Sequence, residues 1–125
     1  MLFEDKLYSI RKMKGVGETL HVSILIIRDH LVFKGHFPDN PVLPGVCTLH
    51  IIGELLSKYL DLKLRLVKSD SIKFINLVVP VENTILDYKF SISNKEENIV
   101  SVKCSVTNNE VEILKMKGSY LCQKI

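Results

Sequence analysis

The sequence predicts an α+β domain in which one long helix packs against an antiparallel sheet of about six strands. Residues 45–60 repeat apolar side chains at helical spacing, whereas runs on both sides of them alternate apolar and polar side chains with the period of a strand. Short polar turns separate most of these runs, and strands joined by short turns pair antiparallel. The chain has 125 residues, so we expect a single domain over residues 1–125.

The chain begins with a predicted β-hairpin. Residues 7–14 and 18–27 read as its two strands, and Gly15 and Gly17 are expected to bracket the turn. The second strand alternates apolar and polar residues before it becomes continuously apolar. His21 falls on the polar side of this alternation, so we expect it at the surface.

A proline-rich loop follows the hairpin and leads directly into the helix. Residues 33–46 contain Pro38, Pro41 and Pro44 together with a single histidine, His36. Each proline fixes its own φ and biases the preceding residue toward extended geometry, so the loop is expected to be stiff. Pro44 also suits the first turn of a helix, where its missing N–H costs nothing.

The helix predicted over residues 45–60 has two faces. Its apolar arc comprises Leu49, Ile51, Ile52, Leu55, Leu56, Tyr59 and Leu60. The opposite, polar arc comprises His50, Glu54, Ser57, Lys58 and Asp61. We therefore expect one broad apolar face to lie on a sheet and a polar face to carry His50 near its start.

Four more strands are predicted after the helix, at residues 66–79, 86–93, 100–107 and 111–121. The first of them is expected to end at Pro80, and polar turns at residues 94–98 and 108–109 separate the last three. One helix cannot form a separate layer on both faces of such a sheet. The sheet must therefore curl around the helix, or a second subunit must cover the remaining face.

Composition limits the class of protein. A hydrophobic fraction of 46% with 25% charged residues is ordinary for a soluble globular domain. A net charge of +3 does not by itself indicate a nucleic-acid-binding protein. No apolar run is long enough to cross a bilayer, and the first residues lack the layout of a signal peptide. We therefore expect a cytoplasmic protein.

Three cysteines, Cys47, Cys104 and Cys122, lack CxxC spacing, which argues against a disulfide framework and against a zinc site. We expect buried free thiols. Cys47 follows the predicted helix start, where a thiol can become reactive, but no base lies beside it in sequence, and packing is the favoured role.

Lysines and one arginine gather around the end of the helix and the next strand: Lys58, Lys63, Arg65, Lys68 and Lys73. They could meet an acidic partner, or they could form an ordinary solvated surface, which is the more common role of such a cluster.

Residues 33–46 read FKGHFPDNPVLPGV, and this stretch resembles the signature of the beta-hydroxyacyl-acyl-carrier-protein dehydratases of the hotdog superfamily. Residues 72–80, IKFINLVVP, resemble the strand that follows the helix in that family. The resemblance implies a hotdog fold, in which a strongly curved antiparallel sheet wraps one long central helix. The sequence departs from the family pattern at two positions. His50 stands where an acidic helix residue is usual, and Val81 stands where a glycine is usual.

The resemblance also implies a reaction, the removal of water from a 3-hydroxyacyl thioester carried on acyl carrier protein. Fatty-acid synthesis or a related lipid or polyene pathway would use it. The implied partner is that acidic carrier, and the chain is expected to form at least a homodimer, with His36 and the helix residue contributed by different subunits. No organic cofactor or metal is implied, because eliminating water needs only an acid, a base and stabilisation of an oxyanion.

His36 is the candidate base, because an imidazole with an ordinary pKa of about 6.5 is largely neutral at working pH. Without the surrounding motif, a histidine that bonds a backbone carbonyl inside the loop would be the simpler interpretation. The resemblance places the neighbouring Phe37 among the substrate-binding residues. Backbone N–H groups of Gly45 and Val46 open the helix and could stabilise a thioester oxyanion, although Gly45 could also be a simple glycine at a helix start.

His50 has three possible roles. As an imidazolium it could donate the proton that the usual acid supplies, or it could hold a water that does so, and Glu54 four residues later would favour the charged ring. Alternatively, both residues are solvated or lie at a subunit contact, and His36 performs both proton transfers.

Two other functions compete with dehydration. A thioesterase of the same fold would use Glu54 or a similar group to activate water. A non-catalytic acyl-carrier-binding protein would explain the loss of the acid at position 50.

Overall fold

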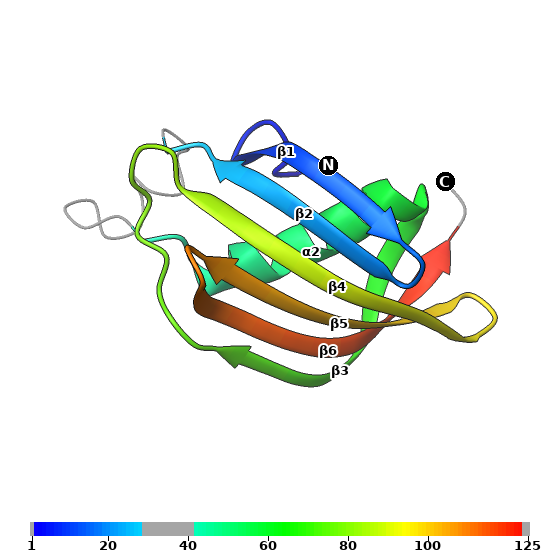
Figure 1. Cartoon of the computed structure of the whole chain (residues 1–125). Coiled ribbons are helices and arrows are strands. Elements are labelled where there is room, and N and C mark those ends of the chain that lie inside the picture. Colours follow the sequence, from blue (N-terminus) through cyan, green and yellow to red (C-terminus); the bar gives the residue numbers. More distant parts are fainter. Residues whose placement is uncertain (1, 29–41, 124–125) are drawn as a thin grey trace.

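The computed structural model describes residues 2–28 and 42–123. Its elements in chain order are β1 (Tyr8–Val16), β2 (Thr19–Ile26), α2 (Gly45–Leu60), β3 (Lys63–Phe74), β4 (Ile85–Glu96), β5 (Ile99–Asn108) and β6 (Val111–Gln123). All neighbouring strands pair antiparallel in one sheet with the order β1-β2-β4-β5-β6-β3 (Figure 1). The predicted fold class, strand number and helix bounds are therefore confirmed.

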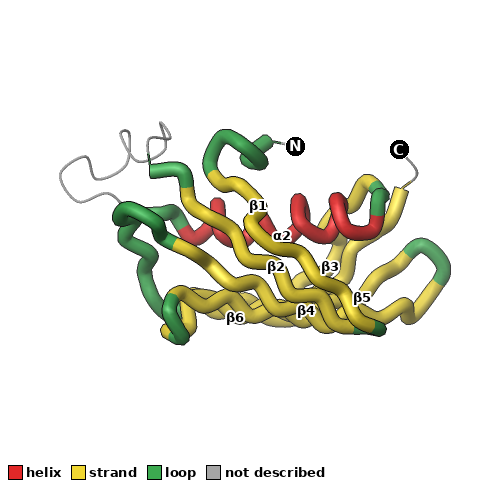
Figure 2. Tube along the Cα trace, turned by 45° about the horizontal axis from the view of Figure 1, so that its top comes forward, coloured by secondary structure: helices red, strands yellow, loops and turns green. Residues whose placement is uncertain are grey.

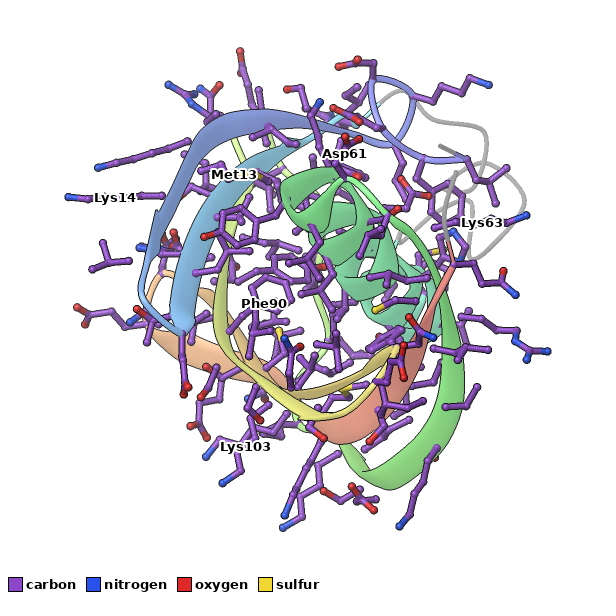
Figure 3. The ribbon with its side chains drawn as sticks, turned by 90° about the vertical axis from the view of Figure 1, so that its right-hand side faces the viewer. Met13, Lys14, Asp61, Lys63, Phe90 and Lys103 are labelled. Carbon is purple, nitrogen blue, oxygen red and sulfur yellow. The ribbon has the colours of Figure 1, made fainter. Side chains whose placement is uncertain are left out.

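The sheet curves around α2, which lies along its inner face (Figures 2 and 3). Ile51, Ile52, Leu55 and Leu56 of the helix are completely buried against the sheet. Burial of each such side chain contributes about 1.5–3 kcal/mol to folding. Tyr88, buried in β4, also donates a hydrogen bond of 3.0 Å to the carbonyl of Thr48, which ties the first half of the helix to the sheet. Of the two arrangements expected for one helix and six strands, the curled sheet is the one observed.

The hairpin forms as predicted, but its turn is shifted. β1 continues through Gly15 to Val16, and the turn consists of Gly17 and Glu18, with Gly17 at a φ of 59° that favours glycine. Gly15 lies in the strand, where a Cβ atom would fall 2.0 Å from the Tyr59 hydroxyl. The prediction that Gly15 borders the turn was therefore wrong, because this glycine makes room for a side chain of the helix.

β3 differs most from its predicted bounds. It begins at Lys63 and ends at Phe74, whereas residues 66–79 were expected. After Phe74 the chain leaves the sheet, and Val78 forms an isolated bridge with Leu43 just before the helix. An apolar run that continues past the end of a strand concealed this boundary. β3 is an edge strand, and its only neighbour within the described chain is β6.

The three thiols are free, but they are not equally buried. Cys47 and Cys104 belong to the core, whereas Cys122 is only partly buried near the end of β6, so the expectation of three buried thiols was wrong for Cys122. Burial raises the pKa of the Cys47 and Cys104 thiols. A raised pKa fits packing better than nucleophilic chemistry for Cys47. Within the described residues, no helix combines the length and apolar character needed to span a membrane.

Candidate active site

The start of α2 is fixed by contacts on both sides. Leu43 donates a backbone hydrogen bond of 2.8 Å to Val78, and Pro44 follows as the N-cap with extended backbone angles. The ring of Phe74 covers Gly45 so closely that a Cβ atom there would lie 2.7 Å from ring carbons. Glycine at this position therefore lets the end of β3 pack on the first turn of the helix.

The first turn of α2 borders a small cavity. Pro44 offers its carbonyl to Cys47 and Thr48, whereas the N–H groups of Gly45 and Val46 have no acceptor among the described residues. Unpartnered N–H groups at the positive end of a helix dipole attract a negative oxygen. The cavity, of about 270 Å³, is lined by Leu43, Gly45, Val46, Thr48, Phe74, Asn76, Leu77, Val78, Ile113 and Leu114.

One turn further along α2, Nε2 of His50 lies 3.0 Å from Oε2 of Glu54. The His50 side chain is 48% exposed, whereas that of Glu54 is only 6% exposed. Both residues line a groove of about 640 Å³ between the helix and β3, together with Leu2, Val46, Leu49, Gly53, Ser57, Lys63, Leu64, Leu66 and Tyr120. Val46 lines both this groove and the cavity at the helix start, so the first turn of α2 borders both spaces.

Glu54 is the residue whose position departs most from expectation. It was predicted on the polar arc, yet it is buried, because the segment before β1 folds over it. Its carboxylate accepts hydrogen bonds from the backbone N–H groups of Phe3 (3.0 Å) and Glu4 (3.1 Å), and from the hydroxyl of Tyr8 (2.9 Å). A buried carboxylate needs such donors to offset its loss of hydration.

Neighbouring groups hold the same segment in place. The ring of Phe3 meets the ring of His50 edge to face, with centroids 5.1 Å apart, and Glu4 forms an ion pair with Lys58. Desolvation, followed by the nearby charge of Glu54, raises the pKa of the Tyr8 hydroxyl, which therefore stays a hydrogen-bond donor to the carboxylate. The pair of His50 and Glu54 is thus held from its outer side by Phe3, Glu4 and Tyr8.

No sequence pattern predicted this support for Glu54. Three residues that contact Glu54, namely Phe3, Glu4 and Tyr8, precede it by more than forty residues and belong to no motif, so only the folded chain brings them together. His36 and Phe37, predicted as catalytic and substrate-binding residues, lie outside the described residues. Among the described residues, no group of three or more His, Cys, Asp or Glu side chains is arranged to hold a metal ion.

A single long helix that lies along the inner face of a curved antiparallel sheet is typical of one class of fold. These elements define a hotdog-fold protein, as the resemblance implied, and solved structures agree. The dehydratase heterocomplex ApeI:P from Xenorhabdus doucetiae superposes with a TM-score of 0.72 at 15% identity over 90% of this chain and 96% of that one. A hypothetical thioesterase from Streptococcus pneumoniae, solved with coenzyme A, gives a TM-score of 0.64 at 16% identity over 94% and 86% of the two chains. At these identities the likeness concerns the fold.

Sequence comparison gives the family. The chain belongs to the ApeI-like family, described as ApeI dehydratase, which it matches over residues 12–114. It is also 31% identical over 109 residues to the 3-hydroxyacyl-acyl-carrier-protein dehydratase FabZ of Campylobacter lari, covering 78% of this chain and 70% of that protein. The expected membership of a hotdog dehydratase family is confirmed.

Proposed function

We propose that this chain removes water from a 3-hydroxyacyl thioester carried on acyl carrier protein and forms the trans-2-enoyl thioester. Its membership of a dehydratase family supports the reaction class. The observation that carries the assignment of roles is the His50–Glu54 pair, which borders the groove beside the free amides at the start of α2.

The proposed first step takes a proton from the carbon next to the thioester carbonyl. Neutral His36 accepts this proton, and the electron pair of the broken C–H bond moves into the carbonyl, whose oxygen becomes negative. The N–H groups of Gly45 and Val46 would bind that oxygen, and donors fixed before the reaction stabilise developing charge most effectively.

In the second step the electron pair returns, the new carbon–carbon double bond forms and the bond to the 3-hydroxyl breaks. Protonated His50 gives its proton to the departing hydroxyl, which leaves as water. With Nε2 held by Glu54, Nδ1 is the ring nitrogen that can donate. His36 ends the cycle protonated and His50 neutral, and exchange with solvent restores both.

Glu54 would act here through His50. Three donors already occupy its buried carboxylate, which leaves it poorly placed to activate a water molecule. Its fixed carboxylate, with Oε2 3.0 Å from Nε2 of His50, instead orients the imidazole. This arrangement supports dehydration over the thioesterase alternative, in which Glu54 would have to act as a base.

We further propose that the active unit contains at least two copies of the chain. Within the described chain, one edge of β3 is unpaired over its twelve residues. Apolar side chains are exposed along this strand and just after it: Leu66, Val67, Phe74, Ile75, Leu77 and Val79. A long edge strand with exposed apolar residues invites pairing with another strand. A second copy paired there would close the groove beside His50, and this dimer could bring His36 of one copy toward His50 of the other.

The experiment is to incubate the purified protein with 3-hydroxyacyl-carrier protein and follow the products by mass spectrometry. Loss of one water from an intact thioester supports the proposal. Release of the free thiol would indicate a thioesterase, and no reaction together with retained carrier binding would indicate a non-catalytic partner. Equal rates for the wild type and His36→Ala would exclude the proposed base.

A further inference from the structure

The outer face of the sheet carries a cluster of lysines that the proposed reaction does not use. Five exposed lysines, here called the lysine face, come from four adjacent strands: Lys73, Lys89, Lys103, Lys115 and Lys117. They border a shallow groove of about 440 Å³ whose lining also includes Ser71, Ser91 and Ser105. Lys103 points away from the helix side of the sheet (Figure 3).

Sheet register explains how this cluster arises. Lys103 on β5 lies directly opposite Lys117 on β6, and Lys115 on β6 lies directly opposite Lys73 on β3. Lys89 on β4 faces Ser105, which itself faces Lys115. These positions are far apart in sequence, and of the basic cluster around the helix end, only Lys73 belongs to the face.

Few ion pairs involve the lysine face within the described chain, although Glu18 and Asp70 line a neighbouring groove together with Lys103 and Lys117. Lys115 lies 3.0 Å from Glu112, whereas no ion pair involves any of the other four lysines in this part of the structure. The nearest carboxylate on β4, Asp87, already accepts hydrogen bonds from His21 and Ser23.

Folding alone does not account for this arrangement. Like charges placed directly opposite each other on paired strands destabilise a sheet. Lysines that protect a sheet from aggregation sit on edge strands, but β4, β5 and β6 are interior strands with neighbours on both sides. Solubility does not require a surface of lysines alone, because charges of mixed sign keep a protein equally soluble.

We propose that the lysine face docks the acidic face of a helix belonging to a partner protein. Neighbouring strands lie about 4.8 Å apart, and side chains one helical turn apart on a helix are separated by about 5–6 Å. Glutamates or aspartates at successive turns can therefore meet lysines on successive strands, while the serine hydroxyls accept or donate the remaining hydrogen bonds.

A helix fits better than a nucleic acid. Among the described residues, the groove lining contains no arginine, the side chain that binds phosphate in a bidentate manner. Its one aromatic ring in this part of the chain, Phe90, is buried and cannot stack on a base. The face lies on the opposite side of the sheet from α2 and His50, so docking there leaves the groove open and does not depend on the proposed reaction.

The test measures binding of two labelled helical peptides by fluorescence anisotropy at low salt. One carries glutamates four residues apart along one face, and the other carries glutamines at the same positions. We expect the glutamate peptide to bind at least about tenfold more tightly, with an affinity that falls as salt rises. Amide chemical shifts that move on β4, β5 and β6 would locate the contact.

Two variants of equal net charge complete the test. Lys103→Glu/Lys117→Glu should weaken glutamate-peptide binding at least about tenfold and should bind a lysine-bearing peptide instead. Lys6→Glu/Arg28→Glu, which changes exposed residues outside the lysine face, should alter the affinity less than about twofold. Equal binding of both peptides, equal loss in both variants, or tighter binding of a single-stranded oligonucleotide or of anionic vesicles would overturn the proposal.

Discussion

The carboxylate of Glu54 and the hydroxyl of Tyr8 lie 2.9 Å apart, and this buried hydrogen bond joins the first strand to the centre of the helix. On its other side the same carboxylate lies 3.0 Å from His50. One buried glutamate therefore anchors the segment before β1 and also orients the side chain that we propose as the acid.

Replacing Glu54 by glutamine should lower stability. The amide group keeps the shape of the carboxylate but removes its charge, and one of the donors from Phe3, Glu4 and Tyr8 would then face an N–H₂ group. We expect the free energy of unfolding to fall by about 1–3 kcal/mol, measured by urea denaturation. Glu112→Gln, at an exposed ion pair, is the control and should change it by less than about 0.5 kcal/mol. Equal effects would show that Glu54 is not an anchor.

Removing the Tyr8 hydroxyl should have a similar but separate effect. In Tyr8→Phe the ring still fills its buried site, so the change isolates the hydrogen bond to a charged acceptor. A loss of about 1.5–3 kcal/mol is expected in the same assay. Tyr59→Phe, on the partly exposed end of the helix, is the control. The anchoring role of Tyr8 would be contradicted if the two variants were equally stable.

Stability should decline at alkaline pH. Burial raises the pKa of Tyr8, Tyr88 and Tyr120 above the ordinary value of 10.0, so these hydroxyls stay protonated in the folded chain at a pH where the unfolded chain loses their protons. The stabilisation is complete below about pH 10 and is lost as the pH rises above it. Urea denaturation at pH 8 and pH 10.5 should show the fall, and Tyr8→Phe should reduce it. A free energy of unfolding that does not change over this range would contradict the prediction.

Two glycines should respond to alanine in opposite directions. At Gly118 on β6 a Cβ atom would lie 2.6 Å from the carbonyl oxygen of Lys68 in β3, so Gly118→Ala should destabilise the fold by about 1–3 kcal/mol. At Gly53 in the helix a Cβ atom would meet only the Tyr120 ring at 3.7 Å, and Gly53→Ala should stabilise by about 0.5–1 kcal/mol. Thermal unfolding of both variants measures these effects. A neutral Gly118→Ala would contradict the close approach of β3 to β6 at this position.

Periodicity and turn residues were sufficient to predict the elements. Apolar spacing predicted the helix at its observed bounds, and alternation with asparagine-rich turns predicted the last three strands. The end of β3 was missed because residues 75–79 are apolar except for Asn76, although the strand has already ended at Phe74. Local patterns report the side chains that a segment buries, but they do not report where its hydrogen bonding stops.

The candidate site was predictable only where it depends on local spacing. Positions four apart on a helix share a face, so the pairing of His50 with Glu54 followed directly from the sequence. The burial of Glu54 could not be predicted from the sequence, because it depends on a segment fifty residues away that folds back over the helix. The lysine face likewise exists only once four strands are in register.

The most direct test of the proposed function is the initial rate of trans-2-enoyl thioester formation from 3-hydroxyacyl-carrier protein by the wild type and by His50→Gln. Circular dichroism should first establish that both are folded. Because a positioned acid accelerates such a reaction by about 10²–10⁴-fold, we predict a loss of at least about a hundredfold in His50→Gln. A variant that keeps the wild-type rate would contradict the assignment of His50 as the acid.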